Sequence, residues 1–236
     1  MTGKYFNFSD VLGYGWRVMK ANFWFLVGVG LTFFIITYLP TALRIAVMHL
    51  PLSMAIRFPL IISLVLVGWV INIILSIGLI KISLGFCDEQ RPAFMALFDT
   101  RGCFWRYAAT MILYGLIILG GFVLLIVPGV IWGIKFGLCF YFVIDKGLGP
   151  IEALKASSRT TMGVKWQLFG FAAIGGLINL LGLLCLIVGI FAAYPTVIIA
   201  NALVYRQLSA QTPELAEFGI PAVQTVSAPS SNGQNL

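Results

Sequence analysis

A run of about forty residues, from Trp166 to Tyr205, contains no acidic residue, no basic residue and no histidine. A transmembrane helix needs about 20 predominantly apolar residues, so this run is too long for one crossing and about right for two. Further apolar runs precede it, and 60% of all residues are hydrophobic whereas 10% are charged. Because lipid offers no hydrogen-bond partners, such segments must pair their backbone polar groups internally, as helices. The sequence therefore predicts an all-α, polytopic helical membrane protein.

Six transmembrane helices in three hairpins are predicted, with limits set by prolines, glycines and charges. The predicted spans are about 22–39, 60–82, 107–127, 130–144, 167–187 and 190–206. Together they form an integral membrane domain over residues 1–209. Residues 210–236 are rich in Ser, Pro, Gln and Asn and are predicted to be a disordered cytoplasmic tail. Pro40 is expected to end the first span, and residues 40–58 are expected to form a loop with a short interfacial helix.

Landmark residues recur at equal spacing in the second and third predicted hairpins. Gly129 lies 16 residues before Asp145, and Gly189 lies 16 residues before Tyr205. The last hairpin is therefore expected to turn near Gly189, as the middle one is expected to turn at Pro128-Gly129. Each unit would contain an amphipathic helix, a tryptophan at the interface, a span, an outer turn and a second span. Internal repeats are common in membrane proteins that enclose a site, although any chain of helical hairpins has some regularity.

The basic residues gather on one predicted side of the membrane. Twelve of the fifteen lie there, whereas Arg44 and Arg57 lie on the opposite side and Lys135 lies within a span. By the positive-inside rule the side with twelve is cytoplasmic, so both termini are predicted to be cytoplasmic. Three amphipathic segments on this side are predicted to lie at the membrane surface, as residues 11–24, 85–107 and 149–166.

The sequence contains no motif typical of catalysis or cofactor binding. A single histidine, His49, excludes His-rich metal sites and HExxH chemistry. There is also no GxSxG elbow, Walker loop or GxGxxG turn. Every acidic residue lies outside the predicted spans, whereas ion-coupled carriers usually have acids inside them. We therefore expect no enzymatic activity, cofactor or metal. The net charge of +7 comes from basic residues beside spans, which disfavours nucleic-acid binding.

Four basic residues are candidate contacts for a lipid or substrate. Lys135 is the one ionisable residue inside a predicted span, which is by default a functional hypothesis. Its side chain is expected either to reach the outer headgroups or a backbone carbonyl, or to contact an anionic lipid or substrate. Lys155, Arg159 and Lys165 belong to the third amphipathic segment. They are expected either to anchor it at the interface or to bind anionic headgroups or a partner protein.

Three glycines recur every four residues along the fourth predicted span. Gly129, Gly133 and Gly137 form a ridge of the kind that lets a neighbouring helix approach closely. The neighbour is expected to be another helix of the same chain, with a second copy as the alternative. The oligomeric state is left open.

The second half of the chain resembles a known family. The similar features are the Val-Pro-Gly at residues 127–129, the basic Lys135, Asp145 with a glycine soon after it, and the EALKAS segment at 152–157 ahead of a Trp-led apolar hairpin. Over about 120–207 the chain resembles the membrane-domain family of glycerophosphoryl diester phosphodiesterases and related uncharacterised bacterial inner-membrane proteins. The resemblance implies a bacterial inner-membrane protein with about six helices. It implies no hydrolysis, because that activity belongs to a separate catalytic domain, and it supplies no catalytic residues.

Taken together, these features predict a non-enzymatic, multi-pass protein of the cell inner (plasma) membrane. Its expected role is that of a scaffold or accessory protein that binds membrane lipids or a membrane-protein partner in the bacterial envelope. The alternative is a transporter or channel for a small solute or lipid. A water-accessible cavity that reaches Lys135, Asn179 or Asn201 would favour transport, whereas a filled helical bundle would favour the scaffold.

Overall fold

A computed structural model describes residues 4–51, 53–100, 102–184 and 188–220. Within these residues every regular element is a helix, as the sequence predicts. The α-helices are α1 (Phe8–Ala21), α2 (Phe23–His49), α3 (Met54–Cys87), α4 (Phe104–Leu124), α5 (Ile126–Phe136), α6 (Cys139–Lys146), α7 (Pro150–Thr160), α8 (Lys165–Leu184) and α9 (Val188–Ala210). Two short 3₁₀ helices are η1 (Phe94–Leu97) and η2 (Pro213–Phe218).

Five helical segments of the described chain are long and apolar enough to cross a membrane. They are Phe23–His49, Met54–Cys87, Phe104–Leu124, Val127–Lys146 and Lys165–Leu184. The architecture is therefore that of a multi-pass helical membrane protein. α9 covers the sixth predicted span, at 190–206, but is not one of the five, and it has Pro195 in its interior.

Most of the loop predicted over residues 40–58 is regular helix, which covers residues 40–49 and 54–58. α2 continues through Pro40 to His49, and α3 begins at Met54, so the predicted limits 22–39 and 60–82 are both too short. A proline inside a helix removes one backbone hydrogen bond and costs about 3 kcal/mol. Ending a helix inside lipid would instead leave several carbonyl groups unpaired. Continuation through Pro40 therefore has the lower free energy.

The fourth predicted span, at 130–144, is covered by two helices, α5 and α6. α4 ends at Leu124, and α5 begins at Ile126, so the break falls at Leu125 instead of at Pro128-Gly129. Pro128 is accommodated in the first turn of α5, where its missing N–H would have no helical partner. A second interruption at residues 137–138 separates α5 from α6.

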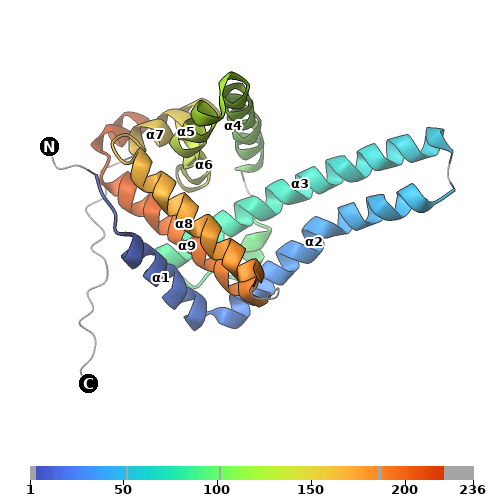
Figure 1. Ribbon diagram of the computed structural model, residues 1–236, viewed down its shortest axis with the longest axis horizontal. Helices are drawn as coiled ribbons and strands as arrows, with labels where there is room; N and C mark the ends of the chain where they lie inside the picture. Colours follow the sequence, from blue (N-terminus) through green and yellow to red (C-terminus); the bar gives the residue numbers. More distant parts are fainter. Residues whose placement is uncertain (1–3, 52, 101, 185–187, 221–236) are drawn as a thin grey trace.

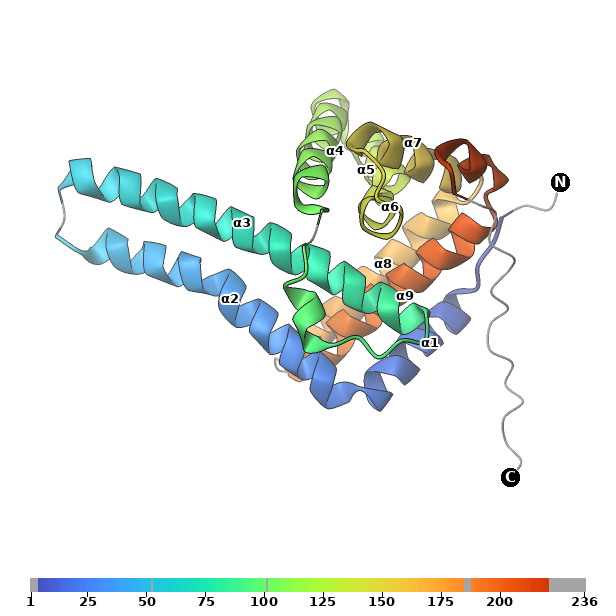
Figure 2. The ribbon, with the colours of Figure 1, turned by 180° about the vertical axis from the view of Figure 1, so that it is seen from behind.

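The three amphipathic segments predicted at the membrane surface differ in structure. The first forms α1, which packs on α9 so closely that a Cβ on Gly15 would lie 2.5 Å from the Thr196 carbonyl oxygen. The second, over 85–107, contains little helix besides η1. η1 packs against α3 (Figure 2). The third forms α7, whose first turn is capped by the Gly149 N–H donating to Glu152 Oε2 at 3.1 Å.

The last hairpin and the tail also depart from their predicted limits. α8 ends at Leu184 and α9 begins at Val188, so Gly189 lies within α9. Residues 185–187, between the two helices, lie outside the described part of the chain. Residues 211–220 of the predicted disordered tail are folded. They contain η2, and Leu215 and Ile220 are 1% and 5% exposed. The rest of the tail, residues 221–236, lies outside the described part.

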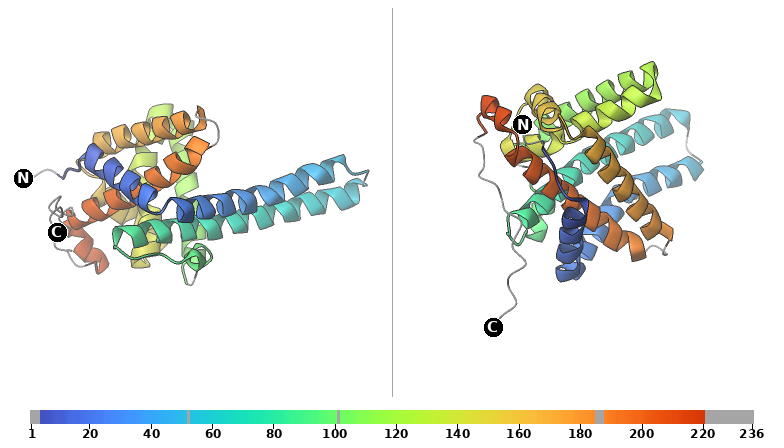
Figure 3. Two further views of the ribbon diagram at one scale, coloured as in Figure 1. Left: turned by 90° about the horizontal axis from the view of Figure 1, so that it is seen from below. Right: turned by 60° about the vertical axis from the view of Figure 1, so that its left-hand side comes forward.

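The helices form three sequential pairs that diverge from a common region. α2 contacts α3, α4 contacts α5, and α8 contacts α9. Figure 1 shows the α2–α3 pair extending far to one side, while α4 points upward and the α8–α9 pair points downward. Figure 3 shows that the distal half of α2–α3 projects away from all other helices. The region where the pairs meet, here called the base, comprises the C-terminal ends of α3, α6 and α9 together with α7 and η2.

Two groups of buried apolar side chains hold this arrangement together. The larger lies in the base and includes Phe142, Tyr205 and Leu208, each with no exposed surface. The smaller joins α1, α2, α3 and α9 through residues such as Leu26 and Leu75. In contrast, large apolar side chains are exposed along most of the α2–α3 pair. This distribution is expected of a protein whose outward-facing helices contact lipid instead of water.

Candidate functional site

The base contains a cluster of charged and polar side chains, which we call the base cluster. It consists of Asp88, Asp145, Lys146, Tyr205 and Arg206. The Arg206 guanidinium bridges two carboxylates, with Nη1 donating to Asp145 Oδ2 at 2.8 Å and Nη2 donating to Asp88 Oδ2 at 2.7 Å. The Tyr205 hydroxyl donates to the same Asp145 oxygen at 2.8 Å, and the Lys146 ammonium lies 3.1 Å from it. One carboxylate oxygen thus receives three donors.

Three helix ends supply the base cluster. Asp88 caps the C-terminus of α3, Asp145 lies in the last turn of α6, and Arg206 lies near the end of α9. The side chains of Asp145 and Arg206 are 12% and 20% exposed, whereas that of Asp88 is 40% exposed. The inner pair is therefore largely withdrawn from water, where a charge is stable only when it is paired and hydrogen-bonded.

Aromatic packing fixes the position of Tyr205 in the base cluster. Tyr205 stacks on Tyr141 at 5.2 Å between ring centroids and meets the edge of Phe142 at 4.9 Å. Beyond α6 the chain reverses at Gly147, whose φ of +63° is readily adopted by glycine. The carbonyl of Gly147 accepts a hydrogen bond from Arg106 of α4. α4 is thereby tied to the same region.

The base cluster has the chemistry of a structural network. Its acidic oxygens accept hydrogen bonds from its own basic and hydroxyl groups. In the part of the chain that the structure describes, no group of three or more His, Cys, Asp or Glu side chains is placed to hold a metal ion. Of the four cysteines, Cys87, Cys103 and Cys139 are free thiols, and Cys185 lies outside the described residues.

The N-terminal segment and the folded part of the tail meet above α7. The Tyr5 N–H donates to Gln211 Oε1, and Gln211 Nε2 donates to the Tyr5 carbonyl, both at 3.0 Å. Lys4 Nζ donates to the Arg159 carbonyl at 2.9 Å. Burial lowers the pKa of Lys4, and the nearby carboxylate of Glu214 partly opposes this effect. Two sequence-distant ends are therefore held together on α7.

The predicted lipid contacts on α7 and beside it have different environments. Arg159 forms an ion pair with Glu217 of η2 at 2.9 Å and lies 5.9 Å from the ring centre of Phe218. Lys155 and Lys165 are exposed. The guanidinium of Arg159 is thus occupied by the tail, while Lys155 and Lys165 are open to an outside partner.

Lys135 lies at the last turn of α5, close to α7. Its carbonyl accepts hydrogen bonds from Ser157 Oγ at 2.9 Å and Thr161 Oγ1 at 3.2 Å, and its ammonium lies 5.0 Å from the ring centre of Phe136. These contacts join Lys135 to the segment that carries Lys155.

The three glycines of the predicted ridge differ in how closely a neighbour approaches. A Cβ on Gly129 would lie 2.9 Å from the Phe122 ring, and one on Gly121 of α4 would lie 2.8 Å from Gly129 Cα. A Cβ on Gly133 would meet nothing closer than 3.9 Å. A Cβ on Gly137 would lie 2.9 Å from the Gly133 carbonyl oxygen of its own helix. The close helix contact is therefore at Gly121 and Gly129, within the chain.

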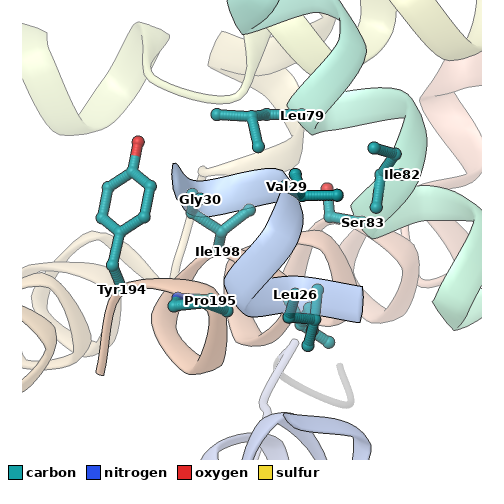
Figure 4. Close-up of a pocket in the computed structure, with 10 residues that line it drawn as sticks. Leu26, Val29, Gly30, Leu79, Ile82, Ser83, Tyr194, Pro195 and Ile198 are labelled. Carbon is teal, nitrogen blue, oxygen red and sulfur yellow. The ribbon is translucent and has the colours of Figure 1, made fainter. Parts of the chain in front are cut away.

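A small cavity lies where α2, α3 and α9 meet. It encloses about 30 Å³ and is lined mainly by aliphatic side chains, as Figure 4 shows for Leu26, Leu79 and Ile198. Its serine, Ser83, donates to the Ile80 carbonyl at 2.8 Å, so that the hydroxyl is already paired. An apolar space of this size stays dry and offers nothing to orient a polar ligand.

A larger and more polar cavity lies between α2 and α3, in the half of the pair that projects from the base. It is open on one side and has a volume of about 210 Å³, and its lining includes Thr37, Thr41, Arg44 and Asn72. Neither this cavity nor the apolar one is lined by Lys135, Asn179 or Asn201. Asn201 Nδ2 donates within its own helix, to the Val197 carbonyl at 2.9 Å.

Sequence reasoning missed the base cluster and the α2–α3 cavity. The equal spacing from Gly129 to Asp145 and from Gly189 to Tyr205 singles out two members of the base cluster, but it does not say that their side chains meet. The sequence predicts a loop over residues 40–58, and in such a loop Arg44 would be an isolated charge on the outer side of the membrane. Comparison with known proteins adds no assignment, because no family model, curated protein or solved structure matches the chain. The family resemblance stays a prediction.

Proposed function

We propose that the protein is a non-enzymatic scaffold or accessory protein of a bacterial inner membrane. In this proposal the base lies at the cytoplasmic surface, and the helix pairs enter the bilayer from it. The observation that carries the scaffold role is the base cluster, whose charged groups bind one another and join α3, α6 and α9. A catalytic or transport site would need such groups to face a substrate.

Exposed tryptophans support the proposed membrane placement. Trp24, Trp105 and Trp166 each lie in the first turn of an apolar helix and are 83%, 81% and 82% exposed. Tryptophan is enriched where the hydrocarbon meets the headgroups, so the three mark one boundary of the bilayer beside the base. The exposed Lys155 and Lys165 would then face the anionic headgroups of the cytoplasmic leaflet. Lys135 is assigned to the same side, since α7 binds its carbonyl.

The alternative function is transport of a small solute or lipid. One observation favours it: Asn179 Oδ1 in α8 is buried and has no hydrogen-bond partner among the described residues. An unpaired amide oxygen in a membrane helix is expected either to meet a neighbouring helix or to line a path. The apolar cavity between α2, α3 and α9 supports the scaffold instead.

Cysteine labelling distinguishes the two functions. In a variant without the four native cysteines, Asn179→Cys and Asn201→Cys would be treated with a membrane-impermeant thiol reagent. The scaffold predicts that both react as slowly as Phe171→Cys, a position that is 2% exposed. Reaction of either at a rate near that of the exposed Lys155→Cys would contradict the scaffold and support a water-filled path.

A further inference from the structure

The α2–α3 cavity contains polar atoms that the protein itself leaves without partners. Thr37 Oγ1 and Arg44 Nε are both buried, and neither has a hydrogen-bond partner among the described residues. Both residues line the cavity, together with Thr41 and Asn72. A buried polar group without a partner destabilises a protein, and a charged group does so more strongly. These atoms are therefore suited to a ligand that supplies hydrogen-bond acceptors.

The counter-charge for Arg44 has to come from outside this part of the chain. All eight acidic residues lie outside residues 11–87, which include the whole of α2 and α3. The nearest acids along the chain, Asp88 and Asp10, belong to the end of α3 and the start of α1, next to the base. The cavity lies in the projecting half of the helix pair. The expected ligand is thus an anion.

Helix length places Arg44 at a particular depth in the bilayer. Trp24 marks one boundary, and Arg44 follows it by 20 residues along one continuous helix. At 1.5 Å per residue this is about 30 Å, which equals the thickness of the hydrocarbon layer. Arg44 therefore reaches the phosphate level of the opposite leaflet. Thr37 lies about 10 Å deeper, two helical turns towards the acyl chains.

We propose that the α2–α3 cavity binds a phosphate ester, with a phospholipid of the outer leaflet as its source. The Arg44 guanidinium binds the phosphate, because its planar donors match phosphate oxygens. The hydroxyls of Thr37 and Thr41 and the Asn72 amide hydrogen-bond to the glycerol and ester oxygens below it. Gly68 and Pro40 also line the space, at a point where α2 and α3 pack against each other. The inference rests on the proposed membrane placement but not on the scaffold role.

Lipid binding by the purified full-length protein tests the proposal. The protein in a neutral maltoside detergent would be titrated with phosphatidylglycerol and, separately, with diacylglycerol, which has the same chains without the phosphate. Native mass spectrometry would count the bound lipid. We expect phosphatidylglycerol to bind the wild type at least 10-fold more tightly than diacylglycerol. Arg44→Gln is expected to abolish this preference.

A matched variant and a free anion complete the experiment. Arg57→Gln removes the same charge from the same helix pair. Arg57 Nε is also buried without a partner among the described residues, but Arg57 does not line the cavity and its Nη2 donates to the Leu50 carbonyl. We expect this variant to keep the wild-type preference. Equal lipid binding by wild type and Arg44→Gln, or equal losses in both variants, would overturn the proposal. Inorganic phosphate that displaces the lipid through Arg44 would confirm the phosphate chemistry and identify a free anion as a second source. Because this experiment is done in detergent, its failure is distinct from a failure of the proposed scaffold role or topology.

Discussion

At the scale of single residues, Asp145 is the most heavily bonded side chain in the base. Its Oδ2 accepts from Tyr205 and Arg206 and lies next to Lys146. Tyr205 has no exposed surface, so its hydroxyl has no access to water if the carboxylate is removed. Asp145 is charged, accepts from the buried Tyr205 hydroxyl, and connects α6 to the Arg206 guanidinium, which also bonds to Asp88 of α3. We therefore expect the base to be more sensitive to Asp145 than to any other acid.

Replacing Asp145 by alanine tests this expectation. Asp145→Ala leaves Tyr205 and the inner nitrogen of Arg206 without an acceptor. Removing one partner of a buried ion pair costs about 3–5 kcal/mol, and partial exposure of Arg206 reduces the expected loss to roughly 2–4 kcal/mol of unfolding free energy. The half-exposed Asp88 is the control, because Asp88→Asn is expected to cost no more than about 1 kcal/mol. Denaturant unfolding in detergent measures the unfolding free energy of both variants. Equal losses would contradict the expectation that the base is more sensitive to Asp145 than to Asp88.

A second residue-scale feature links α1 to the end of α3. The Tyr14 hydroxyl donates to the Phe86 carbonyl at 2.7 Å. Burial, with a smaller effect of nearby negative charges, raises the pKa of Tyr14 to about 12. The hydroxyl therefore stays protonated at neutral pH and remains a donor to the last turn of α3, next to Asp88.

At the scale of the element, the contact between α4 and α5 depends on two glycines and not on the full ridge. Gly121 and Gly129 approach each other closely, while a Cβ on Gly133 has ordinary van der Waals room. Periodicity identifies glycines that share a helix face, but it does not show how closely the partner helix approaches each of them. At Gly133 the partner helix supplies Tyr114, whose hydroxyl donates to the Gly133 carbonyl at 3.2 Å.

Two alanine substitutions separate these positions. Gly121→Ala forces its new methyl group to within 2.8 Å of Gly129 Cα, so we expect a loss of about 1–3 kcal/mol from overpacking. Gly133→Ala is expected to be neutral or to stabilise by up to about 1 kcal/mol, because alanine is the better helix former. Thermal unfolding in detergent compares the two variants. A larger loss at Gly133 than at Gly121 would show that the ridge packs against a second neighbour.

The elements themselves were largely predictable, because each apolar run has to become a helix in lipid. Their limits were not. Proline was expected to end a helix at residue 40, yet the cost of unpaired backbone groups keeps α2 intact. η2 was hidden in a stretch rich in Pro and Gln, since it folds through tertiary contacts of Leu215 and Ile220. Composition indicates whether such a segment would fold by itself. It does not show that the rest of the protein buries Leu215 and Ile220.

At the scale of the whole molecule, charge pairing and helix divergence were beyond prediction. Asp88, Asp145 and Arg206 are widely separated in the chain and meet through tertiary packing. The three helix pairs also diverge from the base instead of standing side by side (Figure 1). The base connects the three pairs. We propose that it lies at the cytoplasmic surface and that the far ends of the pairs lie on the opposite side of the membrane.

Cysteine labelling in intact cells tests this placement most directly. In a variant without native cysteines, Ser53→Cys and Leu125→Cys probe the ends of the α2–α3 and α4–α5 pairs, and Lys155→Cys probes the base. With a cytoplasmic base, a membrane-impermeant reagent is expected to label Ser53→Cys and Leu125→Cys in intact cells. It is expected to label Lys155→Cys only after the membrane is permeabilised. Labelling of Lys155→Cys in intact cells, with protection of Ser53→Cys and Leu125→Cys, would contradict this placement.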